Sequence, residues 1–230
     1  MKRKPLWLMK MRNKFSYSIL AKISLEIGAI KINLNEPFKW ASGYYMPIYN
    51  DNRMLLMNHK FRETIANGFE KLIKSENLEY DAIAGTSTAG ISPATTLADR
   101  LRCPLIYVRE KPKDHGLKKQ IEGKLYENEK AILIEDLIST GTSSINAVEG
   151  IRNSRGIVKY CLSIFNYGFD EAKKLFEKNS CKTRSLLNYN ELLKVAKEEN
   201  YIHNTQLKSL AEWRKNPWNW GKNHGFPREE

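Results

Sequence analysis

The sequence lacks the features that mark membrane, disulfide-rich, zinc-binding and repetitive proteins. No apolar run approaches the roughly 20 residues that a membrane-spanning helix needs. The cysteines, Cys103, Cys161 and Cys181, are odd in number and widely spaced, with no CxxC pair. The basic N-terminus is followed by too short an apolar run for a signal peptide, and no repeats or low-complexity tracts occur. We therefore expect a protein of the reducing cytoplasm without a membrane partner.

Acidic residues are also few in comparison with basic ones. The chain has 38 lysines and arginines against 26 aspartates and glutamates, a formal net charge of +12. A solvated basic surface accounts for most of this excess, and an anionic ligand or a nucleic acid is the alternative. The 230 residues are 41% hydrophobic and 28% charged, which is typical of one globular domain with a substantial core.

The segment from Ala131 to Ser144 organises the chain. Its apolar start, Ala131 to Ile134, predicts a buried strand, and Glu135 and Asp136 stand where that strand is expected to end. A small, hydroxyl-rich turn from Ser139 to Ser143 follows. Apolar residues then recur at every third position, which predicts a helix packed on the sheet.

This order of strand, acidic pair, turn and helix has a chemical meaning. A turn at the N-terminus of a helix offers backbone N–H groups and the positive end of the helix dipole to a phosphate. Glu135 and Asp136 would repel a phosphate, so we expect them to bind hydroxyl groups or a divalent cation attached to it. A ribose 5-phosphate has this combination of groups.

Strands and helices are predicted to alternate along the middle of the chain. Further strands are expected at Tyr80–Ala84, Leu105–Val108 and Val158–Phe165. Helices are expected at Ser16–Ile27, Asn58–Ser75, Ser92–Arg102, Glu171–Lys178, Asn188–Glu199 and Thr205–Lys215. Such alternation indicates a parallel sheet with right-handed crossovers, whose ligands bind at the carboxyl ends of the strands.

We therefore predict an α/β fold in which helices flank a central, mainly parallel sheet. One domain, residues 1–230, would contain an N-terminal helix and arm or hood (1–57), an α/β core (58–168) and a helical C-terminal part (169–230).

The turn from Gly85 to Gly90 resembles a nucleotide-binding P-loop. Ile91 occupies the position of the essential lysine, so the β- and γ-phosphate contact is missing and an NTPase is excluded. A tight turn against a ligand remains the expectation. Ser92 is predicted to cap the next helix, with Pro93 at its first position.

Residues 109–123 are polar and charged, with prolines and glycines at both ends. This composition predicts a long, mobile loop. One interpretation is a solvated surface. The other is a lid that brings Arg109, Lys113 and His115 onto a polyanion when it closes.

Two aromatic segments have open roles. Phe38–Arg53 contains a Ser-Gly turn between extended pieces and predicts either a hairpin arm or a cover over a planar ligand. The tail carries Trp213, Trp218 and Trp220 among basic residues. We expect these tryptophans to pack on the body or on a partner subunit, with single-stranded nucleic acid as the alternative.

The segment from Ile134 to Ser143 resembles the phosphoribosyl-diphosphate (PRPP) motif of type I phosphoribosyltransferases: a hydrophobic strand, two acids, two apolar residues and a Thr/Ser/Gly turn. Other segments resemble orotate phosphoribosyltransferases in particular. These are Phe38–Gly43, Pro47–Arg53, Gly85–Ile91, Lys113–Gly116, Gln120–Gly123 and Glu212–Pro217. The resemblance extends from about Phe15 to the end of the sequence.

The resemblance implies the type I phosphoribosyltransferase fold and a reaction of pyrimidine synthesis. Orotate and PRPP would be converted to orotidine 5′-monophosphate and pyrophosphate. It also implies Mg²⁺, held through PRPP and water without protein ligands, and a homodimer whose subunits share the loop at 109–123.

The resemblance also assigns the site, position by position. Glu135 and Asp136 would hold the ribose hydroxyls, and Ser139 would also contact orotate. Asp136 is expected to be catalytic together with two residues of the loop, Lys113 and His115, which would grip pyrophosphate with Arg109. The complete PRPP-binding set is Arg109, Lys113, His115, Glu135, Asp136, Leu137, Ile138, Ser139, Thr140, Gly141, Thr142 and Ser143.

Three positions depart from the family pattern. Ala41, Ala89 and Glu110 stand where some members have lysine, so the contacts to the base and pyrophosphate are less defined than those to ribose phosphate. Two other functions are the alternatives. The arm argues against a phosphoribosyltransferase for another nucleobase, and the basic loop argues against a PRPP-sensing regulator that binds RNA.

Overall fold

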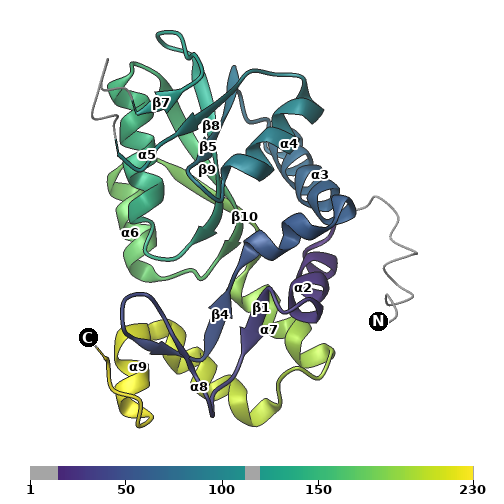
Figure 1. Ribbon diagram of the computed structural model, residues 1–230, viewed down its shortest axis with the longest axis vertical. Helices are drawn as coiled ribbons and strands as arrows, with labels where there is room; N and C mark the ends of the chain where they lie inside the picture. Colours follow the sequence, from purple (N-terminus) through teal and green to yellow (C-terminus); the bar gives the residue numbers. More distant parts are fainter. Residues whose placement is uncertain (1–14, 112–119, 230) are drawn as a thin grey trace.

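A six-stranded sheet forms the centre of the computed structural model, which describes residues 15–111 and 120–229 (Figure 1). The strand order is β10-β9-β8-β5-β6-β7. Five strands are parallel and β7 runs antiparallel to β6. The strands are β5 (Ala82–Thr86), β6 (Leu105–Val108), β7 (Ile121–Glu122), β8 (Lys130–Ile138), β9 (Ile157–Asn166) and β10 (Lys182–Asn188).

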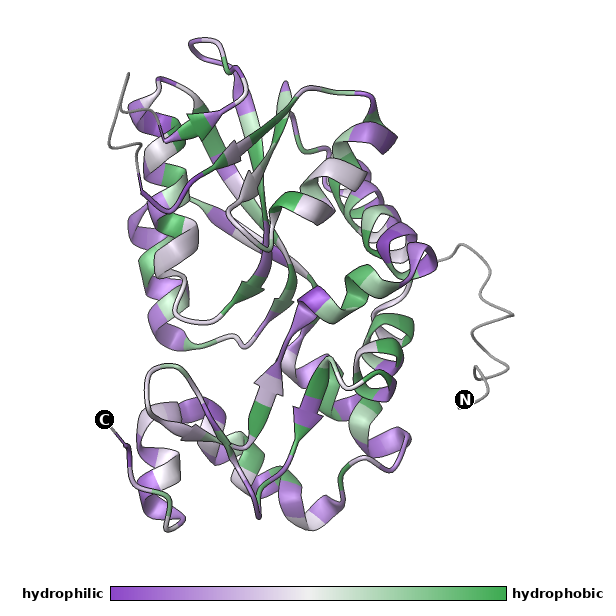
Figure 2. Ribbon diagram, in the orientation of Figure 1, coloured by the Kyte–Doolittle hydropathy of each residue, from purple (hydrophilic) through white to green (hydrophobic). Residues whose placement is uncertain are grey.

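Alternating residues of the central strands enter two separate cores, one on each face of the sheet. Ile132 and Ile134 of β8 belong to one core, and Ala131 and Leu133 belong to the other. Because both faces are covered, the strand is apolar at every position from Ala131 to Ile134, as parallel strands are. Figure 2 shows the same pattern, with hydrophobic residues along the sheet and hydrophilic residues on the outer sides of the helices.

Two helices cover each face of the sheet. Helices α3 (His59–Ser75) and α4 (Ile91–Leu101) pack against the first core through residues such as Phe69 and Leu97. Helices α5 (Thr142–Asn153) and α6 (Asp170–Lys178) lie on the other side (Figure 1).

The N-terminal and C-terminal segments form a second layer of structure below the sheet in Figure 1. Strands β1 and β4 pair antiparallel, and β2 and β3 form a separate hairpin, the arm. Helices α7, α8 and α9 complete this region. The bounds are α2 (Tyr17–Glu26), β1 (Ile30–Ile32), β2 (Phe38–Lys39), β3 (Tyr45–Met46), β4 (Ile48–Asn50), 3₁₀ helix η1 (Asn52–Met57), α7 (Tyr189–Glu198), α8 (Asn204–Lys215) and α9 (Pro217–Asn223).

An aromatic cluster joins the arm to the C-terminal helices. Trp213 is fully buried, and its ring lies within 5.4 Å of the rings of Tyr167, Phe169 and Tyr189, measured between centroids. Its indole N–H points to the sulfur of Met46 at 3.0 Å. The expectation that the tail tryptophans pack on the body is confirmed for Trp213. Trp220 is also buried, at 2% exposure, so neither ring is available to stack on nucleic acid bases.

Arg228 and Glu229, near the end of the chain, bind the arm through side-chain contacts. The Glu229 carboxylate accepts hydrogen bonds from Lys39 at 2.8 Å and from the Tyr45 hydroxyl at 2.5 Å. The Arg228 guanidinium lies 4.8 Å from the centre of the Tyr44 ring and also donates to the Ser42 carbonyl. The predicted hairpin with a Ser-Gly turn is therefore confirmed, and Tyr44 and Tyr45 both contact the tail.

Most predicted elements are present within a few residues of their expected bounds, and four details were wrong. Strand β8 continues to Ile138, so the acidic pair lies inside the strand. Helix α4 begins at Ile91 after Gly90, with no side-chain cap, so Ser92 is not its N-cap. Residues 121–122, predicted as loop, form β7 because they pair with the edge of β6. Residues 169–230, predicted as helical, also contain β10.

Among the described residues, no helix is both long enough and apolar enough to cross a membrane.

Candidate active site

The carboxyl ends of β5, β6 and β8 meet at one edge of the sheet, as predicted for parallel strands. A narrow cavity of about 20 Å³ there is lined by Asp136 of β8, Ala89 and Ser92 near the start of α4, and Asn52 and Arg53 of η1, among others. A wider hollow of about 430 Å³ lies beyond β6, lined by Ser87, Tyr107, Arg109, Glu110 and Lys111. The segments that sequence analysis singled out therefore converge on one region.

The turn after β8 presents an uncapped helix N-terminus. Gly141 precedes the first residue of α5 in the left-handed conformation, with φ of +84°, and no side chain caps the helix there. Thr142 and Ser143, the first two helical residues, are exposed. Their N–H groups have no carbonyl partner within the helix, so they can donate to an anion such as a phosphate. Glycine is required because a Cβ at Gly141 would lie 2.9 Å from Cε2 of Phe176.

Glu135 is buried and connects three elements. Its Oε1 accepts hydrogen bonds from the Thr86 hydroxyl at 2.6 Å and the Asp136 N–H at 3.1 Å. Its Oε2 accepts from the Ser144 hydroxyl of α5 at 2.9 Å. Burial raises the pKa of Glu135 to about 7, and the charge of Asp136 adds to the rise, while the two hydroxyl donors oppose it. The carboxylate thus ties the ends of β5 and β8 to the first turn of α5.

Asp136 is the more accessible acid of the pair. Its side chain contributes to the narrow cavity, and its carbonyl accepts a hydrogen bond from Asn52 Nδ2 at 2.7 Å. Burial raises the pKa of Asp136, whereas hydrogen bonds with Glu135 and the backbone, and the nearby Arg53 guanidinium, lower it. Because neighbouring residues of a strand point to opposite faces, the two acids have different surroundings.

The other predicted residues divide into three groups. Ser139 and Thr140 are partly exposed beside the helix N-terminus. Ile138 is buried in the core, and Leu137 packs against the core, so only their backbone groups can reach a ligand. Arg109 lines the wider hollow, and its guanidinium lies 3.5 Å from Glu122.

Lys113 and His115 lie outside the described residues. The two ends of their segment are joined by hydrogen bonds, because the Arg109 N–H donates to the Gln120 carbonyl and the Gln120 side chain donates to the Arg109 carbonyl, each at 2.9 Å.

Sequence analysis missed four residues of the site: Asn52, Arg53, Thr86 and Ser144. Asn52 and Arg53 belong to a polar run, Asn50 to Arg53, at the end of an otherwise aromatic segment. That change in composition was the available signal. Thr86 lies within the Gly85–Gly90 turn that was expected against a ligand but was not singled out, and Ser144 is one hydroxyl among several.

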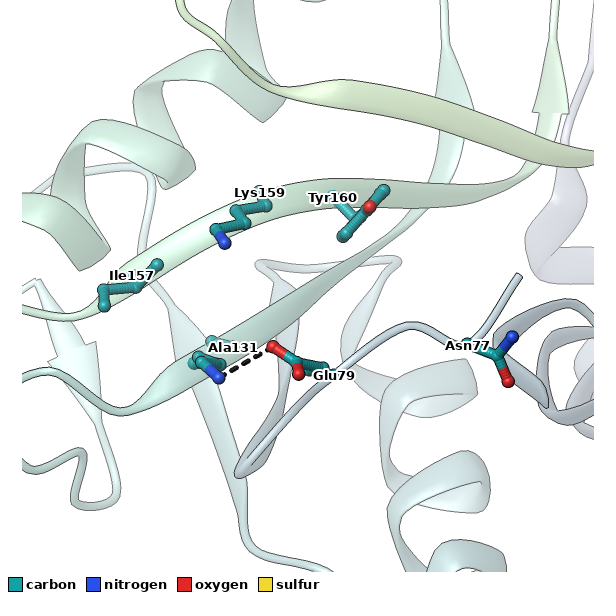
Figure 3. A pocket seen from close by; sticks show the side chains of 7 residues that line it. Asn77, Glu79, Ala131, Ile157, Lys159 and Tyr160 are labelled. Atoms are coloured by element: carbon teal, nitrogen blue, oxygen red, sulfur yellow. Dashed lines mark hydrogen bonds and ion pairs between the residues drawn. The ribbon is translucent and has the colours of Figure 1, made fainter. Parts of the chain in front are cut away.

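A further cavity, of about 130 Å³, lies at the opposite edge of the sheet, where β8 and β9 begin (Figure 3). Its lining includes Asn77, Lys159 and Tyr160, and the ion pair between Lys130 and Glu79 crosses it at 2.7 Å. It is therefore separate from the edge that contains Asp136. Within residues 15–111 and 120–229, no three His, Cys, Asp or Glu side chains gather in a way that could hold a metal ion.

Comparison with known proteins identifies the family. Residues 51–195 match the phosphoribosyl transferase domain. The orotate phosphoribosyltransferase of Listeria innocua is 47% identical over 198 residues, covering 86% of this chain and 95% of the relative. The fold resembles orotate phosphoribosyltransferase from Aeropyrum pernix, with a TM-score of 0.65, 24% identity and coverage of 76% of this chain and 97% of that one.

Leishmania donovani UMP synthase is similar in fold over 90% of this chain, with a TM-score of 0.73 and 24% identity. The chain spans 44% of the length of that larger protein. The predicted α/β architecture is confirmed by these matches and by the sheet. The chain therefore belongs to the orotate phosphoribosyltransferases, within the phosphoribosyltransferase family.

Proposed function

We propose that the chain transfers the 5-phosphoribosyl group of PRPP to orotate at the edge of the sheet that contains Asp136. The observation that carries this proposal is the position of Asp136, a partly exposed acid, six residues before the uncapped N-terminus of α5. The Asp136 carboxylate accepts hydrogen bonds from the ribose 2′- and 3′-hydroxyls. The backbone and hydroxyls of residues 139–143 bind the 5-phosphate.

The reaction breaks the bond between C1 of the ribose and a pyrophosphate oxygen and forms a bond from C1 to a ring nitrogen of orotate. The ring nitrogen of orotate loses its proton to water or to an oxygen of the departing pyrophosphate as the bond to C1 forms, and the protein mainly positions the reactants. Arg109 and Lys111, which line the wider hollow, face the developing charge of pyrophosphate. Lys113 and His115 are proposed to join them from the same loop, and Ser139 is proposed to contact orotate.

The acidic groups of the site fit a magnesium ion that is carried by the substrate. Asp136 is one accessible carboxylate, and Glu135 has both oxygens engaged with protein donors. Mg²⁺ commonly keeps several waters and binds through substrate phosphates, so the ion would be held by PRPP and water without a protein ligand, while Asp136 binds the ribose. When bound with PRPP, the ion would neutralise negative charge on the pyrophosphate.

The subunit partner is proposed to be a second copy of the chain. Met54, Leu56 and Met57 of η1 are exposed, Met57 at 73%, and they lie next to Asn52 and Arg53 of the site. Exposed apolar residues that border a site mark an interaction surface. We propose that the two subunits of this homodimer share the loop at 109–123, as the sequence resemblance implies. The proposed compartment is the cytoplasm.

The test is orotate consumption, followed by its ultraviolet absorbance, with PRPP and Mg²⁺ present and then omitted in turn. Asp136→Asn keeps the size of the side chain and removes its charge. We expect it to reduce kcat/KM for PRPP at least about 100-fold, equivalent to roughly 3 kcal/mol, because two charge-assisted hydrogen bonds are weakened. The matched control is Asp99→Asn, at an exposed position on α4.

Three results would contradict the proposal. One is wild-type protein that does not consume orotate in the complete mixture. Another is a higher rate with uracil or a purine base than with orotate. The third is an Asp136→Asn variant as active as Asp99→Asn.

A further inference from the structure

We propose that Asn52 and Arg53, at the start of η1, are positioning residues that fix the place and the charge of Asp136. This inference rests on the proposed role of Asp136 as the acid that binds ribose. Neither residue needs to touch the substrate. They act from the N-terminal region of the chain on a carboxylate that belongs to the central strand.

Asn52 fixes the backbone of Asp136. The Asn52 side chain is 4% exposed, and its Nδ2 donates to the Asp136 carbonyl at 2.7 Å. The paired residues of β5 and β8 end at Ile134, so beyond that point the register of β8 continues only with β9. Asn52 therefore supplies a hydrogen-bond donor to β8 at a point where this strand no longer pairs with β5. This hydrogen bond limits the rotation of the peptide group of Asp136.

Asn52 is itself held in place by the residue before it. The Asp51 N–H donates to the Ala29 carbonyl at 2.7 Å, and the Asp51 carboxylate accepts from the Arg53 N–H at 3.2 Å at the N-terminus of η1. The position of Asn52 is thus determined by β1, β4 and η1 together. Any movement of β1, β4 and η1 relative to the sheet would therefore displace the peptide group of Asp136.

Arg53 acts on the charge of Asp136. The Asp51 carboxylate holds the guanidinium through two hydrogen bonds, from Nε at 2.6 Å and from Nη2 at 3.0 Å. Arg53 and Asp136 line the same narrow cavity. A cation in the lining of the same cavity favours the carboxylate over the neutral acid, whereas burial of Asp136 favours the neutral acid.

Among the charged groups around Asp136, Arg53 is the cation that favours its ionised form. Glu135 adjoins it on its own strand, and the η1 side contributes Asp51 and Arg53, with Arg62 of α3 in the same cavity lining. The α4 side contributes Ala89 and Ser92, which are both neutral. Loss of Arg53 would remove a positive charge that offsets the negative charges of Glu135 and Asp51, so the pKa of Asp136 would rise.

A charged Asp136 matters because of what it binds. The ribose 2′- and 3′-hydroxyls are both donors, and an ionised carboxylate accepts from two donors more strongly than a neutral acid does. Affinity for the ribose should therefore fall as Asp136 becomes protonated. We expect Arg53 to set the pH at which this fall begins and Asn52 to set the geometry at every pH.

The experiment measures kcat and KM for PRPP from pH 5 to pH 9 in the wild type, Arg53→Gln, Arg53→Lys and Asn52→Ala. For Arg53→Gln we expect the acid limb of kcat/KM to move to higher pH by about half a unit to one unit, as loss of one nearby opposite charge predicts. Arg53→Lys keeps the charge and should restore most of the wild-type profile. Asn52→Ala should lower kcat/KM about 3- to 10-fold at all pH values, the loss expected for one hydrogen bond.

The matched control is Arg155→Gln, which removes an exposed arginine that pairs with Glu127 at 3.0 Å, at the opposite end of α5 from the site. An acid limb that stays in place in Arg53→Gln, or moves equally in Arg155→Gln, would overturn the role of Arg53. An Asn52→Ala variant that keeps wild-type kinetics would overturn the role of Asn52. Failure of the proposed function itself is recognised separately, because the wild type would then not turn over PRPP with orotate.

Discussion

The buried Glu135 carboxyl group gives a stability prediction that depends on pH. Its pKa is raised by burial from 4.5 to about 7, so between these two values the folded protein binds a proton that the unfolded chain has released. Stability should therefore be highest at the acid end of this window and fall as the pH rises through it. If this difference in pKa is attributed entirely to Glu135, the free energy of unfolding falls by roughly 3 kcal/mol across the window.

Glu135→Gln replaces the titrating group with a neutral one of the same shape. The amide oxygen can accept from Thr86 and from the Asp136 N–H, and the amide nitrogen can donate to the Ser144 hydroxyl, so the three contacts are preserved. The variant should then lose the part of the pH dependence that Glu135 causes. Relative to the wild type, it should gain stability between pH 5 and pH 8 by about 1 to 3 kcal/mol.

The assay is urea unfolding at several pH values between 5 and 8, with Glu149→Gln, an exposed position on α5, as the control. The quantity of interest is the difference in free energy of unfolding between variant and wild type, plotted against pH. A difference that is constant across this range would refute the argument, because Glu135 would then be ionised in both states. A difference that falls with rising pH would show that the carboxylate is the form that the network stabilises.

Two further predictions concern stability. Gly141→Ala should lower the free energy of unfolding in urea by at least about 2 kcal/mol, because it combines a φ of +84° with a Cβ 2.9 Å from Phe176. The control is Gly225→Ala, which has a φ of +86° but open space around it and should lower the free energy of unfolding by only about 1 kcal/mol. Equal losses in the two variants would show that the clash with Phe176 is relieved. Trp213→Ala should cost about 3 to 5 kcal/mol by thermal unfolding, since it empties the centre of the aromatic cluster, and a loss below 1 kcal/mol would contradict that packing.

The sequence predicted the parallel core well because its strands are apolar on both faces. The run from Ala131 to Ile134 could only be a buried strand or helix segment, and the acids and turn after it decided between them. Strand β10 was missed for the opposite reason. It begins with exposed Lys182 and half-buried Thr183 at the edge of the sheet, and only Leu186 and Leu187 are buried.

The site was predicted less completely than the fold. The sequence treats Glu135 and Asp136 as equivalent neighbours, yet strand geometry gives the first a buried network and the second a cavity. The contact of Asn52 with Asp136 joins residues 84 positions apart, and no local pattern encodes it. The expected roles of Lys113 and His115 stay predictions, because both residues lie outside the described part of the chain.

The contacts between the arm and residues 228–229 can form only late in synthesis of the chain. Lys39 and Glu229 are 190 positions apart, so a ribosome adds most of the chain after the arm before the arm meets its partner. At about 5 to 20 residues per second this takes roughly 10 to 40 seconds. Over that interval Tyr44, Tyr45 and Trp40 remain without the aromatic rings that later cover them, and they are candidate sites for chaperone binding to the nascent chain.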